Sequence, residues 1–186
     1  MTLELTRYCF TTADYDRMIE AGILDEDDRV ELIEGEIVEM TPIGRRHFGC
    51  VNRLNYHLSA LAADTAQISV QNPIVLGESS EPQPDVVVLK STPDFYSSGL
   101  PTPRDILLLV EVADSSVAID RQIKIPLYAR HGIAEVWLVD LEANLVTTFR
   151  EPHPTGYANV RDVRRGERLV AMAFPSRELA VSDILG

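Results

Sequence analysis

The chain has 186 residues, 45% of them hydrophobic and 25% charged, which are ordinary values for a globular protein and exclude a disordered chain or a disulfide-stapled miniprotein. This length predicts one domain over residues 1–186. The 17 basic and 29 acidic residues give a net charge of −12, which disfavours tight non-specific binding to nucleic acid because few phosphate counterions would be released. A local basic groove or a bound metal ion is compatible with this charge.

The cysteines and the hydrophobic stretches indicate the cellular compartment. Cys9 and Cys50 lie far apart without metal-ligand spacing, so we expect free thiols in a reducing environment. The N-terminus lacks the basic start and apolar run of a signal peptide, and no stretch approaches the length of a membrane span. We therefore expect a cytoplasmic protein that does not bind a membrane.

The N-terminal third predicts a helix, a hairpin and a longer helix. Thr11 or Thr12 can cap a short first helix. The string VELIEGEIVEM indicates two strands joined at Glu34 and Gly35, where glycine permits the positive φ of a tight turn. Residues 45–63 carry apolar side chains at helical spacing and predict the best amphipathic helix of the chain.

Strands dominate the remainder of the chain. They are predicted at 68–76, 84–90 and 106–113. Three prolines and several Ser and Thr residues predict a loop over 91–105. The string AEVWLVD indicates another buried strand, and the residues from 145 onwards alternate like two or three antiparallel strands. The pattern predicts an α/β fold, with a mixed α+β sheet and a β-rich C-terminal end.

A second helix is predicted over 117–131. Pro126 within it should kink the helix or displace its start, because the proline ring removes a backbone donor. Ile123 and Leu127 should face the core. Residues four apart share another face of this helix: Asp120, Lys124 and Tyr128.

Two acidic residues mark the ends of two predicted strands. Asp85 opens the strand PDVVVLK, and Glu111 closes the strand ILLLVEV. If these strands pair as an antiparallel hairpin, both carboxylates can lie at the same end and on the same face of the sheet. Such a pair is costly beside apolar strands unless a cation lies between them, and hard oxygen ligands suit Mg²⁺ or Mn²⁺. The alternative is that each acid only marks a strand end and faces water.

Lys124 is the third candidate, because its helix begins just after the strand that carries Glu111. An ammonium group there could orient an attacking water or stabilise charge that develops at a phosphoryl group. The alternative is an ordinary surface ion pair between Asp120 and Lys124.

The order of these residues resembles the PD-(D/E)XK nuclease superfamily. Within it, the strings VELIEGEIVEM, QPDVVVL, LLVEVADSS and KIPLYARHGIAEVWLVD resemble the Uma-type restriction endonuclease family across residues 8–185. The resemblance implies a restriction-endonuclease-like core with flanking helices and hydrolysis of DNA phosphodiester bonds with Mg²⁺ or Mn²⁺. It implies Asp85 and Glu111 as metal ligands and Lys124 as a catalytic residue. The chain departs from the superfamily motif at Ala113, where lysine is expected, so Lys124 would reach in from the helix instead.

The resemblance also implies roles for two further residues. Glu31 matches the glutamate of the family's hairpin string, and would be an accessory carboxylate that completes a metal shell or holds Lys124. The alternative for Glu31 is a strand-edge glutamate. His47 matches a histidine that begins the family's long helix and could touch a substrate phosphate, while the alternative is a half-exposed structural histidine.

The sequence is therefore compatible with two functions. The first is a metal-dependent DNA endonuclease. The alternative is a catalytically degenerate nuclease fold with a binding or regulatory role, which the acidic charge and Ala113 favour. Enzymes of the restriction type commonly work as two-fold dimers, so we expect a homodimer. Apolar residues of the C-terminal end could supply its interface, such as Val170, Met172 and Phe174.

Overall fold

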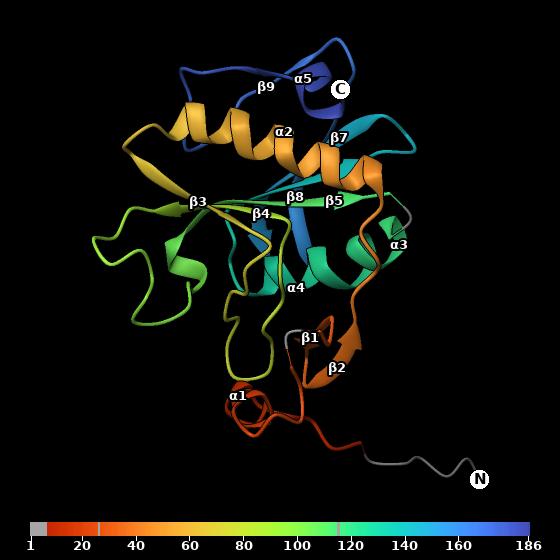
Figure 1. The fold of residues 1–186 in the computed structure, drawn as a ribbon. Helices are drawn as coiled ribbons and strands as arrows, with labels where there is room; N and C mark the ends of the chain where they lie inside the picture. Colours follow the sequence, from red (N-terminus) through yellow and green to blue (C-terminus); the bar gives the residue numbers. More distant parts are fainter. Residues whose placement is uncertain (1–6, 26, 115) are drawn as a thin grey trace, which may run out of the picture.

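A mixed six-stranded sheet forms the centre of the molecule (Figure 1). The computed structural model describes residues 7–25, 27–114 and 116–186. The strands of this sheet are β3 (Ala66–Val70), β4 (Val86–Lys90), β5 (Ile106–Ala113), β6 (Glu135–Asp140), β7 (Leu145–His153) and β8 (Gly156–Arg164). They lie side by side in chain order, and all pair antiparallel except β5 and β6, which are parallel. The predicted α/β fold with a mixed sheet is confirmed.

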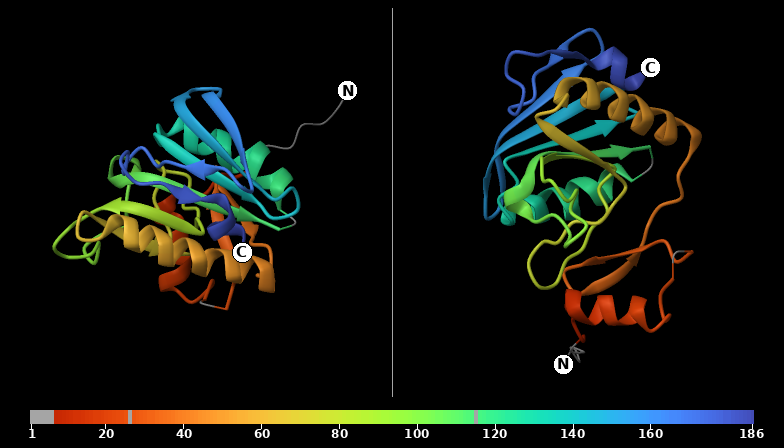
Figure 2. Two further views of the ribbon diagram at one scale, coloured as in Figure 1. Left: turned by 90° about the horizontal axis from the view of Figure 1, so that it is seen from above. Right: turned by 60° about the vertical axis from the view of Figure 1, so that its left-hand side comes forward.

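Helices cover both faces of this sheet (Figures 1 and 2). The helix α2 (Arg45–Ala62) crosses one face and buries one stripe of apolar side chains there, and the short α5 (Val181–Leu185) lies beside it. The helix α4 (Ile125–Arg130) packs on the opposite face. Neighbouring residues of β4 alternate between the two apolar clusters, so that Val86 packs under α2 and Val87 under α4. A strand buried on both faces is what the unbroken apolar runs of the sequence predicted.

The N-terminal segment forms a separate layer below the sheet (Figure 2, right). It consists of α1 (Thr12–Glu20), capped by Thr11, and a two-stranded sheet of β1 (Val30–Ile33) and β2 (Glu36–Glu39). Its turn has positive φ angles at Glu34 and Gly35, as the sequence predicted. A β-bridge between Leu32 and Glu81 joins this layer to the segment that leads into β4. The hairpin is thereby fixed beside the end of the sheet where Asp85 lies.

Some element boundaries differ from those predicted. The strand predicted over 68–76 spans Ala66–Val70 instead, because Gln71 adopts a positive φ of 52° and Pro73 has no amide to donate. Residues 91–105 form the predicted loop, which ends in a 3₁₀ turn, η1 (Pro103–Asp105). The C-terminal end adds a short pair, β9 (Arg168–Leu169) and β10 (Leu179–Ala180), together with α5.

The second helix is interrupted, as Pro126 predicted. It starts with α3 (Val117–Ile119), widens into a π-helical turn, η2 (Asp120–Lys124), and continues as α4. Pro126 lies in the first turn of α4, and the wider turn before it accommodates a ring that a regular helix would exclude. The prediction that Ile123 faces the core is wrong, because the π turn rotates this side chain outward; Leu127 is buried as expected.

Three further expectations concern single residues and surfaces. Cys9 is exposed and Cys50 is buried, and both are free thiols. None of the described helices has the length and apolar character that a membrane span requires. Phe174 is 8% exposed and packs in the core under α2, so its placement at a dimer interface is wrong, whereas Met172 is 53% exposed.

Candidate active site

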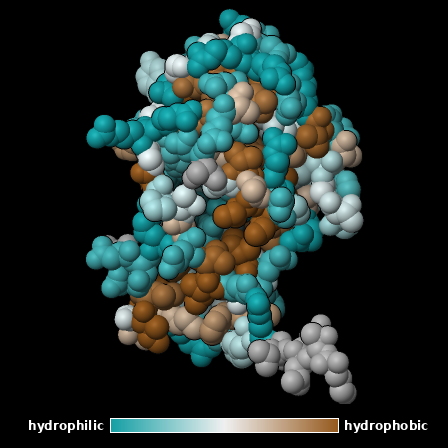
Figure 3. Space-filling model, turned by 90° about the vertical axis from the view of Figure 1, so that its right-hand side faces the viewer, coloured by the Kyte–Doolittle hydropathy of each residue, from teal (hydrophilic) through white to brown (hydrophobic). Residues whose placement is uncertain are grey.

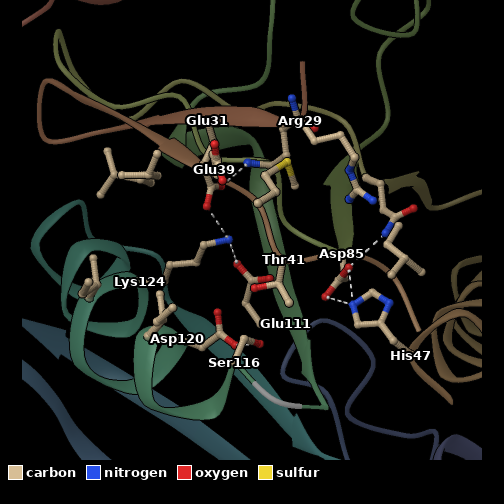
Figure 4. Close-up of a pocket in the computed structure, with 18 of the residues that line it drawn as sticks. Arg29, Glu31, Glu39, Thr41, His47, Asp85, Glu111, Ser116, Asp120 and Lys124 are labelled. Carbon is tan, nitrogen blue, oxygen red and sulfur yellow. Dashed lines mark hydrogen bonds and ion pairs between the residues drawn. The ribbon is translucent and has the colours of Figure 1, made fainter. Parts of the chain in front are cut away.

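Asp85 and Glu111 meet at one end of the sheet (Figure 4). Val86 of β4 pairs with Val110 of β5 in an antiparallel register, which brings Asp85, the residue before Val86, opposite Glu111, the residue after Val110. Both acidic side chains line one cavity of about 520 Å³, between the hairpin, the start of α2 and the π turn. The strand pairing on which the sequence argument depended is therefore present.

Three donors hold the carboxylate of Asp85. The amide of Val112 donates to Oδ2 at 2.8 Å, and the side-chain amide of Gln71 donates to Oδ1 at 3.2 Å. His47 Nε2 lies 3.0 Å from the same carboxylate. Burial lowers the pKa of His47, but the hydrogen bond and the charge of Asp85 outweigh burial and raise it above its usual range. The side chain of His47 is 15% exposed, so it contacts Asp85 from a partly buried position.

Lys124 lies between two carboxylates. Its Nζ is 3.1 Å from Glu31 Oε1 and 3.4 Å from Glu111 Oε1 (Figure 4). The backbone amide of Gln83 donates to the other oxygen of Glu31 at 3.1 Å, and the hydroxyl of Tyr128 donates to Glu111. The three charged side chains belong to residues that are only 3–8% exposed. Lys124 is therefore part of a buried charge network that joins the hairpin to the sheet.

Burial and charge act in opposite directions on this network. Burial raises the pKa of Glu111, and the nearby charge of Lys124 only partly offsets this rise. Burial lowers the pKa of Lys124. The charges of Glu111 and Glu31 raise it by more, so the pKa lies above its usual value. Lys124 accordingly carries a proton throughout the physiological pH range.

The surface ion pair between Asp120 and Lys124, which was the alternative for Lys124, does not form, because Lys124 pairs with Glu31 and Glu111 instead. Asp120 is buried and accepts a hydrogen bond of 2.7 Å from the hydroxyl of Ser116. Burial raises the pKa of Asp120, and the hydrogen bond from Ser116 acts in the opposite direction. Ala113 is fully buried within the apolar cluster under α4, where a lysine side chain would not fit. Lys124 reaches the acidic side chains from the π turn of the helix.

Comparison with known proteins places the chain in a family. A family model described as "Uma2: Putative restriction endonuclease" matches residues 12–182. The chain belongs to the Uma2 family. No curated protein matched it. A crystal structure of "a putative nuclease belonging to DUF820" from Anabaena variabilis ATCC 29413 superposes with a TM-score of 0.75 at 15% identity, covering 95% of this chain and 97% of that one. This likeness shows that the two proteins share a fold.

Several contacts of the Uma2 site were not predicted from the sequence. The spacing of four residues placed Tyr128 on the same helix face as Lys124. Its hydrogen bond to Glu111 was not inferred. Gln71 follows β3 at a positive φ, and nothing in the local sequence distinguishes it from a surface glutamine. The amide of Val112 becomes a donor to Asp85 only because Asp85 stands beyond the last backbone pair of β4. These contacts depend on tertiary structure alone.

Two carboxylates of the site keep oxygen positions that a divalent cation could use. In the described part of the chain, no three or more His, Cys, Asp or Glu side chains are grouped so that they could hold a metal ion. Asp85 already accepts three hydrogen bonds, which leaves about one acceptor position of its carboxylate. Glu111 binds Tyr128 and Lys124 through Oε1, and its Oε2 accepts no contact from the described residues. Two carboxylate ligands with water in the other positions match the preference of Mg²⁺.

Proposed function

We propose that this Uma2 chain is a Mg²⁺- or Mn²⁺-dependent endonuclease that hydrolyses phosphodiester bonds of DNA. The observation that carries the proposal is the meeting of Asp85, Glu111 and Lys124 in one cleft. Two strands supply hard oxygen ligands, and a helical turn supplies a fixed, protonated ammonium group beside them. Membership of a family described as restriction endonucleases supports this reading.

Each residue of the cleft has a separate role in the proposed reaction. Asp85 and Glu111 would hold the cation, which when bound would offset phosphate charge and lower the pKa of a water molecule. Lys124 is protonated, so it would orient the attacking water or stabilise charge on the phosphoryl oxygens rather than accept a proton. Glu31 would hold Lys124 in place. His47 would orient Asp85 rather than contact the phosphate directly.

The alternative is a nuclease fold that has lost catalysis and serves binding or regulation. Lys124 is already paired with two carboxylates, so the network could serve the stability of the fold alone. The net charge of −12 also opposes contact with a polyanion. This alternative predicts that the cleft binds no divalent cation.

Thermal unfolding with and without millimolar Mn²⁺ distinguishes the two functions. The nuclease proposal predicts a rise in Tm, because a ligand that binds only the native state stabilises it. Asp85→Ala should abolish the rise, whereas Glu20→Ala, in the exposed α1, should retain it. Nicking of plasmid DNA in Mn²⁺ by the wild type and by Asp85→Ala then tests the reaction itself. Absence of any Mn²⁺-dependent shift in the wild type would favour the degenerate fold.

A further inference from the structure

The mouth of the cleft carries exposed aliphatic side chains from separate segments. Ile43 precedes α2, Ile119 ends α3, and Ile123 belongs to the π turn. Their exposed fractions are 38%, 52% and 44%. Figure 3 shows hydrophobic side chains gathered on this face of the molecule. Exposed apolar side chains at the mouth of a cleft are typical of a surface that contacts a ligand.

The charges of the cleft are unfavourable for an intact duplex. Two basic side chains, Arg29 and Lys124, line it together with seven acidic ones, which are Glu31, Glu34, Glu36, Glu39, Asp85, Glu111 and Asp120. Four of these acids come from the hairpin that forms one lip. A DNA duplex carries one phosphate charge for about every 1.7 Å of its axis. A duplex laid across the mouth would bring the phosphates of both strands against this acidic lip.

None of the three arginines of α2 lines the cleft, and internal contacts hold two of them. Arg46 forms an ion pair of 2.9 Å with Asp114 and also donates to the carbonyl of Leu141. Arg53 donates to the two last carbonyls of α5, at 2.8 and 2.7 Å. These guanidinium groups fasten α2 to its neighbours. They are therefore not arranged as a basic track for a duplex.

The size of the cleft indicates what it can accept. About 520 Å³ lies in the range of pockets that enclose one small molecule, whereas a duplex is too wide to enter. A nucleotide that has left its stack can enter such a pocket, with its base against apolar side chains. A single strand presents only one row of phosphates and can leave through the open side of the cleft.

We propose that the cleft receives one unstacked nucleotide, with its base against Ile43, Ile119 and Ile123 and its phosphate toward Lys124. The substrate is then single-stranded or locally unpaired nucleic acid rather than intact duplex. This inference rests on the proposed nuclease function and names the class of substrate for the same site.

Fluorescence anisotropy tests the inference directly. A labelled oligonucleotide without self-complementarity is compared with the same strand annealed to its complement, in Ca²⁺ to prevent cleavage. We expect Kd for the single strand to be at least about tenfold lower than for the duplex. The double variant Ile119→Ser, Ile123→Ser should weaken single-strand binding by about tenfold, as expected when one base loses its contact surface. Ile23→Ser, which is exposed but does not line the cleft, is the matched control and should bind like the wild type.

The outcomes separate this inference from the proposed function. Equal or tighter binding of the duplex, absence of binding to either form, or full binding by the isoleucine double variant would each overturn the inference. A Mn²⁺-dependent rise in Tm together with duplex preference would refute the substrate class and leave the nuclease proposal standing. Single-strand binding that depends on the two isoleucines, without any Mn²⁺-dependent shift, would support the nucleotide site and refute the nuclease.

Discussion

At the scale of single residues, the charges of the cleft depend on one another. Glu111 is buried in an environment that favours its neutral form, and Lys124 is the nearest group that favours its ionised form. Lys124 in turn is buried at a cost that its two carboxylate partners offset. Removing one member of such a network leaves a buried charge without compensation, which costs more than the intact pair contributes.

Lys124→Ala should therefore destabilise the protein in a pH-dependent way. The pKa of Glu111 is already raised to about 8 by burial with Lys124 in place, and it rises further without the ammonium group. Wild type and variant therefore lose stability together up to about pH 8, and only the variant continues to lose it above that pH. We expect a loss of about 3 kcal/mol at pH 7 and a larger loss at pH 9.5, measured by urea unfolding. Lys90→Ala, at the exposed end of β4, is the control and should change little at either pH.

The same variant tests catalysis. If the proposed reaction occurs, Lys124→Ala should lower the rate of plasmid nicking in Mn²⁺ by about 10² to 10³, which is typical of losing one electrostatic stabiliser. Lys124→Arg should not restore it, because a planar guanidinium group cannot replace a compact ammonium group between two carboxylates. Nicking at the wild-type rate in Lys124→Ala, in protein shown to be folded, would remove Lys124 from the proposed mechanism.

The sequence could place Asp85 and Glu111 together because strand geometry is simple. Asp85 and Glu111 lie equally far along the chain from the loop that joins two antiparallel strands, so pairing and alternation assign them to one end and one face of the sheet. The contact between His47 and Asp85 joins residues 38 apart in the chain, and that between Tyr128 and Glu111 joins residues 17 apart. No local sequence pattern indicates contacts between residues so far apart in the chain, so these two contacts could not be predicted.

At the scale of elements, the attachment of the hairpin layer decides the shape of the cleft. The hairpin supplies Glu31 and one lip, and it meets the body at the bridge between Leu32 and Glu81. The side chain of Glu81 is buried at this junction. Burial raises its pKa to about 7, and the charge of Asp16 on α1 adds to the rise. An ionised Glu81 therefore opposes the docking of the hairpin layer.

Glu81→Gln should stabilise the protein at alkaline pH. A carboxyl group with a folded pKa of about 7 and an ordinary value of 4.5 loses stability as the pH rises between these values. Above this window the cost is at most about 3 kcal/mol, and a neutral amide of the same shape avoids it. We expect a higher Tm than the wild type at pH 8.5 and an equal Tm at pH 4.5. The exposed neighbour Glu78, changed to Gln, should leave both values unaltered, and a similar gain from Glu78→Gln would show that net charge is the cause.

The interrupted helix shows how far local rules extend. Pro126 predicted a displaced helix start, because its ring affects only the neighbouring turn of the backbone. The form of the displacement was not predictable, since a kink, a 3₁₀ turn and a π turn all accommodate a proline. The π turn directs Lys124 inward and leaves Ile123 exposed at the mouth. One backbone adjustment thus shapes both the base and the rim of the cleft.

At the scale of the whole molecule, the central sheet has a long unpaired edge. Strand β8 is the last strand of the sheet, and no described strand pairs with its outer side. Residues 158–162 at its centre are exposed, and Val160 is 52% exposed. An exposed strand edge invites pairing with another chain. We propose that residues 1–186 form one domain and that two copies pair through β8, within the C-terminal end where the sequence placed the dimer interface.

The pattern of β8 suits an antiparallel pairing with its own copy across a two-fold axis. If the axis passes through Val160, Arg161 lies opposite Asn159 of the other copy, and Asp162 lies opposite Ala158. No like charges then lie directly opposite each other between residues 158 and 162, which avoids the destabilising cross-strand pairs of a mismatched register. Val160→Asp would place two carboxylates side by side at the axis and should disrupt the dimer.

Light scattering at tens of micromolar measures this assembly. We expect the wild type at twice the chain mass of 20.7 kDa and Val160→Asp at the mass of one chain. Phe95→Asp makes the same change of charge at another exposed apolar residue, in the loop at 91–105, and it should remain a dimer because that loop is far from β8 in the sheet order. A wild type that is monomeric at this concentration contradicts the dimer. A Val160→Asp protein that stays dimeric contradicts the β8 interface, because two buried carboxylates at the axis would cost more than one exposed strand edge can offset.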